Sequence, residues 1–236
     1  MTKSVLICSP GRCGMHWVAY VLRETLGLSQ LPTYRYKDSD WKAREITSPG
    51  WLYLTHDPIG LWKPAQDQLD IVCVVRNPMD VVVSAVYYRT MREHGLDERA
   101  QHKAYWGIDT DEHTSFQALL GRIKMQGHNP RWWQGYMSNK DEVKHTVVRY
   151  EDMHEAPLST FTDLLRAMKR NVPNGAIARA VVSQMKQAFP DGRGEMDVSK
   201  FFRRGIVDEW KEHYTPEEAD KFREFHKEEM REFGYY

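Results

Sequence analysis

An apolar run, a glycine-bearing turn and an amphipathic segment follow one another at the start of the chain, and this order constrains the fold most. Residues 5–8 are apolar and rich in β-branched side chains, which predicts a buried strand. Residues 9–14 contain one Pro and two Gly, so we expect a turn there. From Met15 apolar residues recur at helical spacing, and Gly27 is a typical stop for the helix that they predict.

The loop between this strand and helix has the chemistry of an anion site. The first N–H groups of a helix lack internal partners, and the helix dipole places partial positive charge there. Gly11 and Gly14 let the backbone approach an anion closely, and Arg12 adds a permanent charge. We predict a phosphate cradle, with an ordinary turn carrying a surface arginine as the alternative.

Other phosphate-binding patterns are missing from the loop. It lacks G-x-x-x-x-G-K-[ST], which argues against an ordinary ATPase or GTPase. It also lacks Gly-x-Gly-x-x-Gly, which argues against a dinucleotide-binding fold. Neither Cys8 nor Cys13 has an Arg six residues later, so a cysteine-phosphatase loop does not fit.

Length and composition set further bounds. The 236 residues are enough for one large α/β domain over residues 1–236. Lys and Arg total 33, as do Asp and Glu, so no overall field favours nucleic acid or a membrane surface. We expect no signal peptide and no membrane span, since no apolar run is long enough. Cys8 and Cys73 lie in apolar runs, and such buried thiols suit a reducing, cytoplasmic compartment.

Strands and helices are expected to alternate along the rest of the chain. Apolar patterns predict strands at residues 51–56, 70–75 and 145–150. Caps and helical spacing predict helices at residues 78–95, 114–125, 157–170, 174–188 and 216–233, and one that starts at Asn129-Pro130. The helix over residues 216–233 would place Phe222, Phe225, Met230 and Phe233 on its apolar side. The class is therefore α/β with a central parallel sheet flanked by helices, which binds ligands at the carboxyl ends of its strands.

Three segments place groups suited to anions or proton transfer directly after a predicted strand. The first is the loop of Arg12. The second pairs Arg76 with Ser84, which follows it by 84 − 76 = 8 residues, about two helical turns, so that both could share an anion. The third is His56, whose imidazole could act as a general base. The alternatives are a surface arginine, a serine bonded to its own backbone and a structural histidine.

Five segments resemble, in order and with sensible spacing, the motifs of one family, the nucleotide-dependent sulfotransferases of the cytosolic type. Residues 10–17 resemble its 5′-phosphosulfate loop, and residues 76–84 match its 3′-phosphate motif. Residues 54–56 resemble its Lys-Thr-His segment, of which the His is the catalytic base. Residues 150–153 match a Tyr-Glu-Asp segment near the adenine, and residues 202–215 resemble a C-terminal Arg-Lys-Gly segment.

The resemblance implies the fold of the sulfotransferases, which is like that of P-loop-containing nucleotide hydrolases, and a reaction without a metal. The implied donor is 3′-phosphoadenosine 5′-phosphosulfate (PAPS), and the implied product is the 3′,5′-bisphosphate PAP. The implied acceptor is a hydroxyl or amine of a small molecule. The implied catalytic residues are His56, as general base, and Arg12. The implied nucleotide-binding residues are Arg12, Cys13, Gly14, Met15, His16, Trp17, Arg76, Ser84, Tyr150, Arg203, Arg204 and Gly205.

Within that set, the resemblance assigns each residue to one part of the nucleotide. Arg12 and the N–H groups of residues 14–17 would hold the 5′-phosphate. Arg76, Ser84 and residues 203–205 would bind the 3′-phosphate. Trp17 and Tyr150 would flank the adenine.

The chain departs from the family pattern at four site positions. Arg12 replaces a Lys, so a planar fork stands in for a point charge. His16 replaces a Thr, and Leu54 replaces the Lys before the catalytic His, so either His16 supplies the missing donor or the rate is lower. Asp208 replaces the second Gly of the C-terminal segment. The family's dimer signature is altered within residues 211–220, which predicts a monomer or a dimer built in another way.

Two other functions remain open on the sequence. A small-molecule or nucleotide kinase could use the same cradle, and a non-catalytic nucleotide-binding module could share the fold. Aromatic residues near the expected pocket hint at a flat or apolar acceptor such as a phenol or alcohol, with core or lid packing as the alternative. They are Trp41, Trp51, Tyr53, Trp62, Tyr87, Tyr88, Tyr105 and Trp106.

Overall fold

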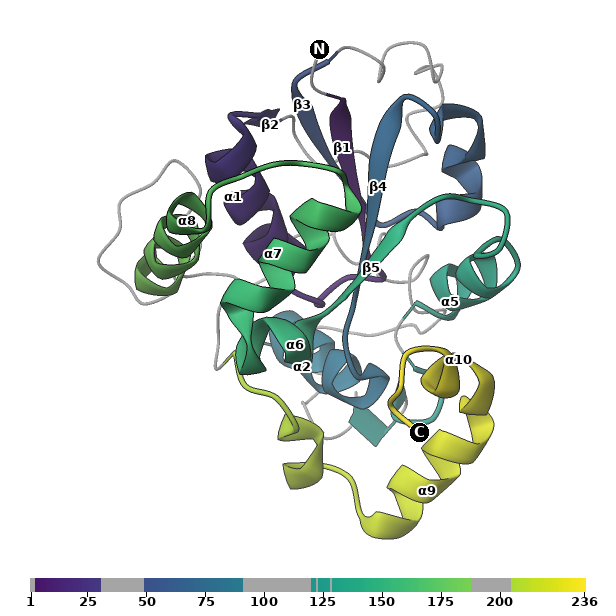
Figure 1. The fold of residues 1–236 in the computed structure, drawn as a ribbon. Helices are drawn as coiled ribbons and strands as arrows, with labels where there is room; N and C mark the ends of the chain where they lie inside the picture. The colour runs from purple at the N-terminus through teal and green to yellow at the C-terminus, as the bar shows by residue number, and fades with distance from the viewer. Residues whose placement is uncertain (1–2, 31–48, 91–119, 122, 128, 188–204) are drawn as a thin grey trace.

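A five-stranded parallel sheet forms the centre of the molecule, as the strand patterns predict (Figure 1). The structure is a computed structural model, and it describes residues 3–30, 49–90, 120–121, 123–127, 129–187 and 205–236. The strands lie in the order β2-β3-β1-β4-β5, and every neighbouring pair is parallel. Their bounds are β1 Ser4–Cys8, β2 Ser29–Gln30, β3 Trp51–Thr55, β4 Leu69–Val75 and β5 Thr146–Arg149.

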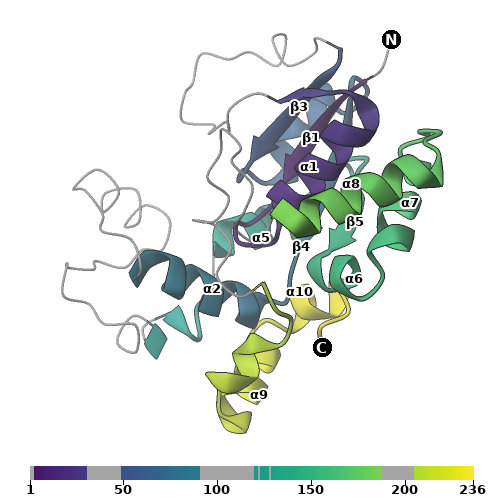
Figure 2. The ribbon, with the colours of Figure 1, turned by 90° about the vertical axis from the view of Figure 1, so that its left-hand side faces the viewer.

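Both faces of the sheet are buried, which explains the uninterrupted apolar strands. Side chains alternate along a strand, so Val5 and Ile7 of β1 join one core cluster while Leu6 and Cys8 join another. The first cluster is covered by three helices and the second by a 3₁₀ helix and an α-helix on the opposite side (Figures 1 and 2). These are α1 Met15–Leu26, α7 Pro157–Ala167 and α8 Asn174–Gln187, and η1 Ile59–Ala65 and α5 Pro130–Met137.

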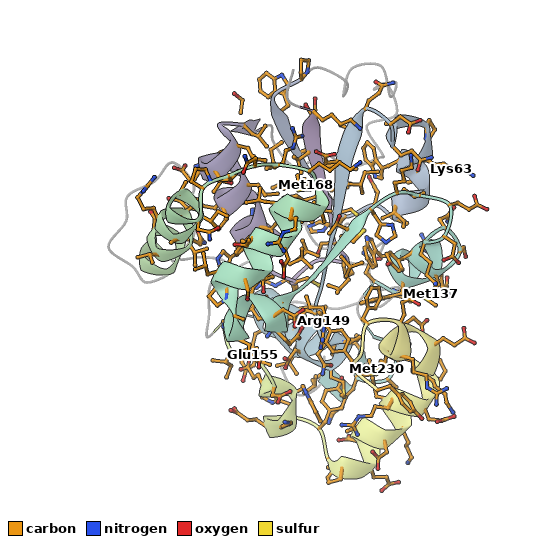
Figure 3. The ribbon with its side chains drawn as sticks, in the orientation of Figure 1. Lys63, Met137, Arg149, Glu155, Met168 and Met230 are labelled. Atoms are coloured by element: carbon orange, nitrogen blue, oxygen red, sulfur yellow. The ribbon has the colours of Figure 1, made fainter. Side chains whose placement is uncertain are left out.

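Figure 3 marks the two layers by single residues. Met168, directly after α7, lies on one side of the sheet, and Met137 at the end of α5 lies on the other. Met168 belongs to the first cluster and Met137 packs against the second.

The remaining helices gather where the strands end, in the lower half of Figure 1. A third apolar cluster joins α2 to the C-terminal helices through Met79, Val83, Trp210 and Phe222. The C-terminal segment therefore lies beside the sheet edge at which ligands are expected. The helices of this region are α2 Pro78–Thr90, α6 Tyr150–Glu155, η3 Glu209–Glu212, α9 Pro216–Phe225 and α10 Lys227–Glu232.

Several predicted helix ends are confirmed by their caps. Gly27 ends α1 in the left-handed conformation, with φ 64°. Asn77 accepts a hydrogen bond from the backbone N–H of Met79 at 3.0 Å, as expected of an N-cap. Asn129 caps α5, and Thr215 and Glu218 form both hydrogen bonds of the predicted capping box.

Other expectations about the elements were wrong. The strand predicted over residues 145–150 ends at Arg149, and Tyr150 instead begins α6. The last predicted helix is two helices, since the chain breaks at His226, and the side chain of Phe225 is 72% exposed rather than apolar-facing. The two-residue strand β2 is not among the strands predicted from the sequence. The start of the helix predicted over residues 114–125, up to position 119, lies outside the described residues.

The structure also bears on the expected burial of the cysteines and on the expected lack of a membrane span. Cys8, Cys13 and Cys73 are free thiols and all are buried, as predicted for Cys8 and Cys73. Among the described helices, not one has both the length and the apolar character needed to cross a bilayer.

Candidate active site

The loop after β1 has a backbone that favours glycine at two of its positions. Gly11 and Gly14 have φ of 98° and 83°, and Arg12 between them has φ 59°, which side-chain-bearing residues rarely adopt. A Cβ atom at Gly14 would lie 2.7 Å from Cδ2 of Tyr150, so the ring leaves no room for a side chain. Glycine at position 14 thus permits both the turn and the approach of Tyr150 to the start of α1.

Hydrogen bonds from three directions hold this loop. Ser9 donates its N–H to the carbonyl of Thr55 at 3.2 Å, and Asn129 donates its amide to the carbonyl of Pro10 at 3.2 Å. The thiol of Cys13 donates to the carbonyl of Gly11 at 3.1 Å. Burial raises the pKa of Cys13 to about 12, so this cysteine stays protonated and shapes the loop rather than acting as a nucleophile.

Residues predicted to bind the 5′-phosphate and residues predicted to bind the 3′-phosphate contact each other at Arg12. Its Nε donates to Oγ of Ser84 at 3.3 Å, and Nη1 of Arg76 donates to the backbone carbonyl of Arg12 at 3.4 Å. Three residues predicted to bind anions therefore converge from β1, β4 and α2.

Arg76 is buried, with 5% of its surface exposed. Its guanidinium lies 4.3 Å from the centre of the Tyr150 ring and donates to the carbonyl of Ile206 at 2.8 Å. It also lies 3.7 Å from a carboxylate oxygen of Asp80. Its Nε is buried without a hydrogen-bond partner, an arrangement that costs free energy unless an acceptor is supplied. An anion that reached this donor would supply such an acceptor.

His56 follows β3 and is oriented by the loop of β1. Its Nδ1 lies 3.0 Å from the carbonyl oxygen of Ser9. Because a carbonyl only accepts, Nδ1 carries the proton, and Nε2 of the neutral ring then holds a lone pair. This is the tautomer that a general base needs.

His16 and Leu54, the two residues that differ from the family pattern at the catalytic positions, have different consequences for the site. His16 is half-buried, and burial lowers its pKa to about 4, with repulsion from Arg12, and from His56 in its protonated form, acting in the same direction. It is therefore neutral at pH 7 and offers a hydrogen bond but no charge. Leu54 is fully buried in the core, so β3 presents an apolar group where the resemblance expects Lys.

The rings assigned to the adenine lie together and are buried. The centres of the Trp17 and Tyr150 rings are 6.4 Å apart at an angle of 80°, and 7% and 4% of the two residues are exposed. His154 adds a third ring, at 5.1 Å from Trp17 and 4.6 Å from Tyr150. Nε1 of Trp17 is buried without a partner. The sequence analysis missed His154, although it follows Tyr150 by four residues and so shares its helix face.

The C-terminal segment reaches this site through its backbone. Gly205 has φ 61° and precedes Ile206, which accepts from Arg76. Arg203 and Arg204 lie outside the described residues. The structure therefore brings the start of the described segment to Arg76.

Two acidic residues of the site were also missed as contributors. Asp80 accepts hydrogen bonds from the N–H groups of Asp208 and Trp210. Glu151 accepts from the N–H of Asn77 at 2.9 Å and from the hydroxyl of Tyr235 at 2.7 Å. Both acids lie within motifs that the sequence analysis used, but their partners are distant along the chain.

Two of the aromatic residues considered for the acceptor belong to the core. Tyr53 and Trp62 are 2% and 4% exposed and pack in the cluster under η1 and α5. Tyr53 and Trp62 therefore serve core packing, which was the alternative to a place beside the acceptor. Trp41, Tyr105 and Trp106 lie outside the described residues.

Comparison with known proteins identifies similar chains. A family described as "Sulfotransferase domain" matches residues 21–234. "Sulfotransferase 1 family member D1" of Rattus norvegicus is 27% identical over 198 residues, which cover 77% of this chain and 62% of that protein. The match thus spans less than two thirds of the relative's length.

Solved structures show the same fold. The crystal structure of mouse sulfotransferase SULT7A1 complexed with PAP has a TM-score of 0.71 at 17% identity, covering 97% of this chain and 85% of that one. Retinol dehydratase in complex with androsterone and inactive cofactor PAP has a TM-score of 0.65 at 14% identity, covering 96% and 80%. At such identities the likeness concerns the fold, and it agrees with the predicted class.

Proposed function

Since the chain belongs to the sulfotransferase family, we propose that it moves the sulfuryl group of PAPS to a hydroxyl or amine of a small molecule and releases PAP. The observation that carries this proposal is the convergence of Arg12, Ser84 and Arg76 at the sheet edge. His56 follows the neighbouring strand in the tautomer of a general base. Cations and a base at one edge suit the transfer of an anionic group to a nucleophile.

In this proposal the nucleotide lies between the β1 loop and Arg76. Arg12, with the N–H groups of residues 14–16, holds the 5′-phosphate at the start of α1, and Cys13 keeps the loop in shape. The N–H of Trp17, which the resemblance includes, instead donates to the carbonyl of Gly14 at 2.9 Å. Arg76 and Ser84, joined by residues 203–205, hold the 3′-phosphate. The unmet Nε of Arg76 supports this role. Trp17 and Tyr150 flank the adenine.

The donor supplies the sulfuryl group. The side chains of this protein position the donor and the acceptor and stabilise the charge that develops during transfer. His56 accepts the proton of the acceptor at Nε2, an effect worth about 10²–10⁴ in rate. Arg12 stabilises the charge left on the departing phosphate. His16, which is neutral, donates a hydrogen bond where the apolar Leu54 cannot. We expect slower turnover than with a lysine at position 54, because a neutral donor stabilises developing charge less than a cation does.

We propose a small-molecule acceptor and a cytoplasmic location. A solved neighbour that shares the fold is in complex with androsterone, which supports a small and largely apolar acceptor pocket. The three free, buried thiols suit a reducing compartment.

Turnover of PAPS with a panel of phenols and alcohols tests the proposal. We expect His56→Ala to lower kcat by about 10²-fold or more. His226→Ala is the matched control, because the His226 ring also bonds a backbone carbonyl, that of Met125 at 3.1 Å, but lies between α9 and α10. Equal turnover in wild type and His56→Ala would remove His56 as the base.

The two alternatives give different results. A kinase would bind ATP with magnesium in preference to PAP, which calorimetry measures directly. A non-catalytic module would bind PAP but turn over no acceptor in the panel. Binding of PAP with turnover that depends on His56 would exclude both.

A further inference from the structure

A buried carboxylate on α2 holds the C-terminal segment against the site. Asp80 is 1% exposed. Its Oδ2 accepts from the N–H of Asp208 at 2.9 Å, and its Oδ1 accepts from the N–H of Trp210 at 2.8 Å. The donors stand 128 and 130 residues further along the chain. One carboxylate thus fixes two backbone groups of a segment far away in sequence.

Arg76 fixes the same segment from its other end. Its Nη2 donates to the carbonyl of Ile206 at 2.8 Å and lies 3.7 Å from Oδ2 of Asp80. Asp80 and Arg76 together therefore hold residues 206–210 by one carbonyl and two N–H groups. Gly205, which the proposed function assigns to the 3′-phosphate, directly precedes this anchored stretch.

The charge and the position of Asp80 have opposite effects on an anion at Arg76. As a charge, the carboxylate offsets the guanidinium and would weaken anion binding. As an anchor, it keeps the guanidinium and the C-terminal backbone in one arrangement, so less ordering is required when the ligand binds. Burial raises the pKa of Asp80, while Arg76 and the two N–H groups act in the other direction.

We propose that Asp80 is a positioning residue for the 3′-phosphate, and that it sets the preference for a 3′,5′-bisphosphate over a 5′-monophosphate by anchoring residues 206–210 beside Arg76. This inference rests on the proposed function, since it assumes that Arg76 binds the 3′-phosphate. The 5′-phosphate is assigned to the loop of Arg12, whereas the hydrogen bonds and the ion pair of Asp80 described above join it to Asp208, Trp210 and Arg76. Asp80 is linked to that loop through Arg76, which donates to the carbonyl of Arg12 at 3.4 Å. The anchor should therefore affect the 3′ end of the nucleotide much more than the 5′ end.

Calorimetry with PAP and with adenosine 5′-phosphate tests the anchor. Asp80→Asn keeps the size of the side chain but sets an amide N–H₂ group against one of the two backbone N–H groups. We expect the Kd for PAP to rise about tenfold or more, as for a lost charge-assisted contact. The Kd for adenosine 5′-phosphate should stay within about twofold.

Asp70→Asn is the matched control. Asp70 of β4 is also paired with an arginine, Arg170, at 2.5 Å, but near the amino end of the strand. We expect this variant to keep the wild-type ratio of the two Kd values. A second variant, Asp80→Glu, keeps the charge and displaces both acceptor oxygens. If Asp80 acts by positioning, this variant binds PAP more weakly than wild type. If Asp80 acts by its charge alone, the Kd for PAP is unchanged.

Each remaining outcome contradicts the inference in a distinct way. Tighter PAP binding by Asp80→Asn would mean that Asp80 acts as an opposing charge only. Equal losses for both nucleotides would indicate general damage to the fold. A wild-type protein without a preference for PAP would refute the proposed function as well, which separates that failure from a failure of the anchor alone.

Discussion

The imidazoles of His56 and His16 are influenced by different parts of their surroundings. The carbonyl of Ser9 fixes the tautomer of His56, so its ring is ready to accept a proton. Burial keeps His16 neutral, and the positive charge of Arg12 adds to the effect. The site thus has one imidazole suited to a base and another suited to a neutral donor.

The neutral His16 makes stability depend on pH. Its pKa falls from 6.5 to about 4 on folding, so between these values the unfolded chain binds a proton that the folded chain does not. The contribution of neutral His16 to the free energy of unfolding is fully present above pH 6.5 and decreases as the pH falls toward 4. We expect wild type to lose about 2 kcal/mol between pH 7 and pH 5 relative to His16→Thr. Urea unfolding at both pH values measures this, and parallel losses in the two proteins would contradict it.

Asp208 shows how a residue other than glycine can occupy a glycine position. Its φ of 65° is left-handed, and its side chain accepts from Nε1 of Trp210 at 3.2 Å and pairs with Lys211. We expect Asp208→Gly to be within about 0.5 kcal/mol of wild type, and Asp208→Ala to lose about 1 kcal/mol because it keeps the strain and loses the contacts. Thermal unfolding compares the two variants, and an alanine variant as stable as the glycine one would show that the backbone strain is small.

At the scale of elements, the ends of α1 test backbone shape against crowding. Gly14 and Gly27 both have positive φ, but only at Gly14 would a Cβ meet another atom, Cδ2 of Tyr150 at 2.7 Å. Gly27→Ala should cost about 1–2 kcal/mol from strain. Gly14→Ala should cost about 3 kcal/mol or more, since the Tyr150 ring must also move. Similar losses in denaturant unfolding would mean that the ring yields freely.

Strands and caps were the elements most open to prediction. Residues 71–75 are apolar on both faces, a pattern typical of a strand buried on both faces, so β4 was found. The capping box at Thr215 is a local signal that needs no tertiary contact, and it also held.

The failures arose where tertiary contacts decide. Tyr150 continues the strand pattern, yet it starts α6, where its ring is buried beneath Arg76. The helical spacing of residues 216–233 passes through His226 without interruption, but the chain ends one helix there and begins another. His226 bonds the carbonyl of Met125, a partner 101 residues away that no local pattern reveals.

At the scale of the whole molecule, the sequence could predict the members of the site but not their contacts. Arg12 and Ser84 are 72 residues apart, and Arg76 and Ile206 are 130 apart. Motif resemblance supplied these residues. The anchoring roles of Asp80 and Glu151 needed the folded chain, because a motif does not show which of its residues bonds to a residue of another motif.

The proposed reaction needs no metal, which chelation tests. Among the described residues, ligand atoms of Glu209, Glu212 and His213 lie within 4.8 Å of one another on and after η3. We expect protein dialysed against a chelator to keep its PAPS turnover within about twofold, since cationic side chains supply the charge stabilisation. Loss of turnover that magnesium or zinc restores would contradict this and would direct attention to that group.

A crystal structure of the protein with PAP tests the central claim most directly. The account predicts the 3′-phosphate within hydrogen-bond reach of Arg76 and Ser84, and the 5′-phosphate at the start of α1 beside Arg12. It also predicts that Nε2 of His56 faces the side of the 5′-phosphate from which an acceptor would approach. PAP bound elsewhere, or bound with Arg12 and Arg76 both turned away from its phosphates, would contradict it.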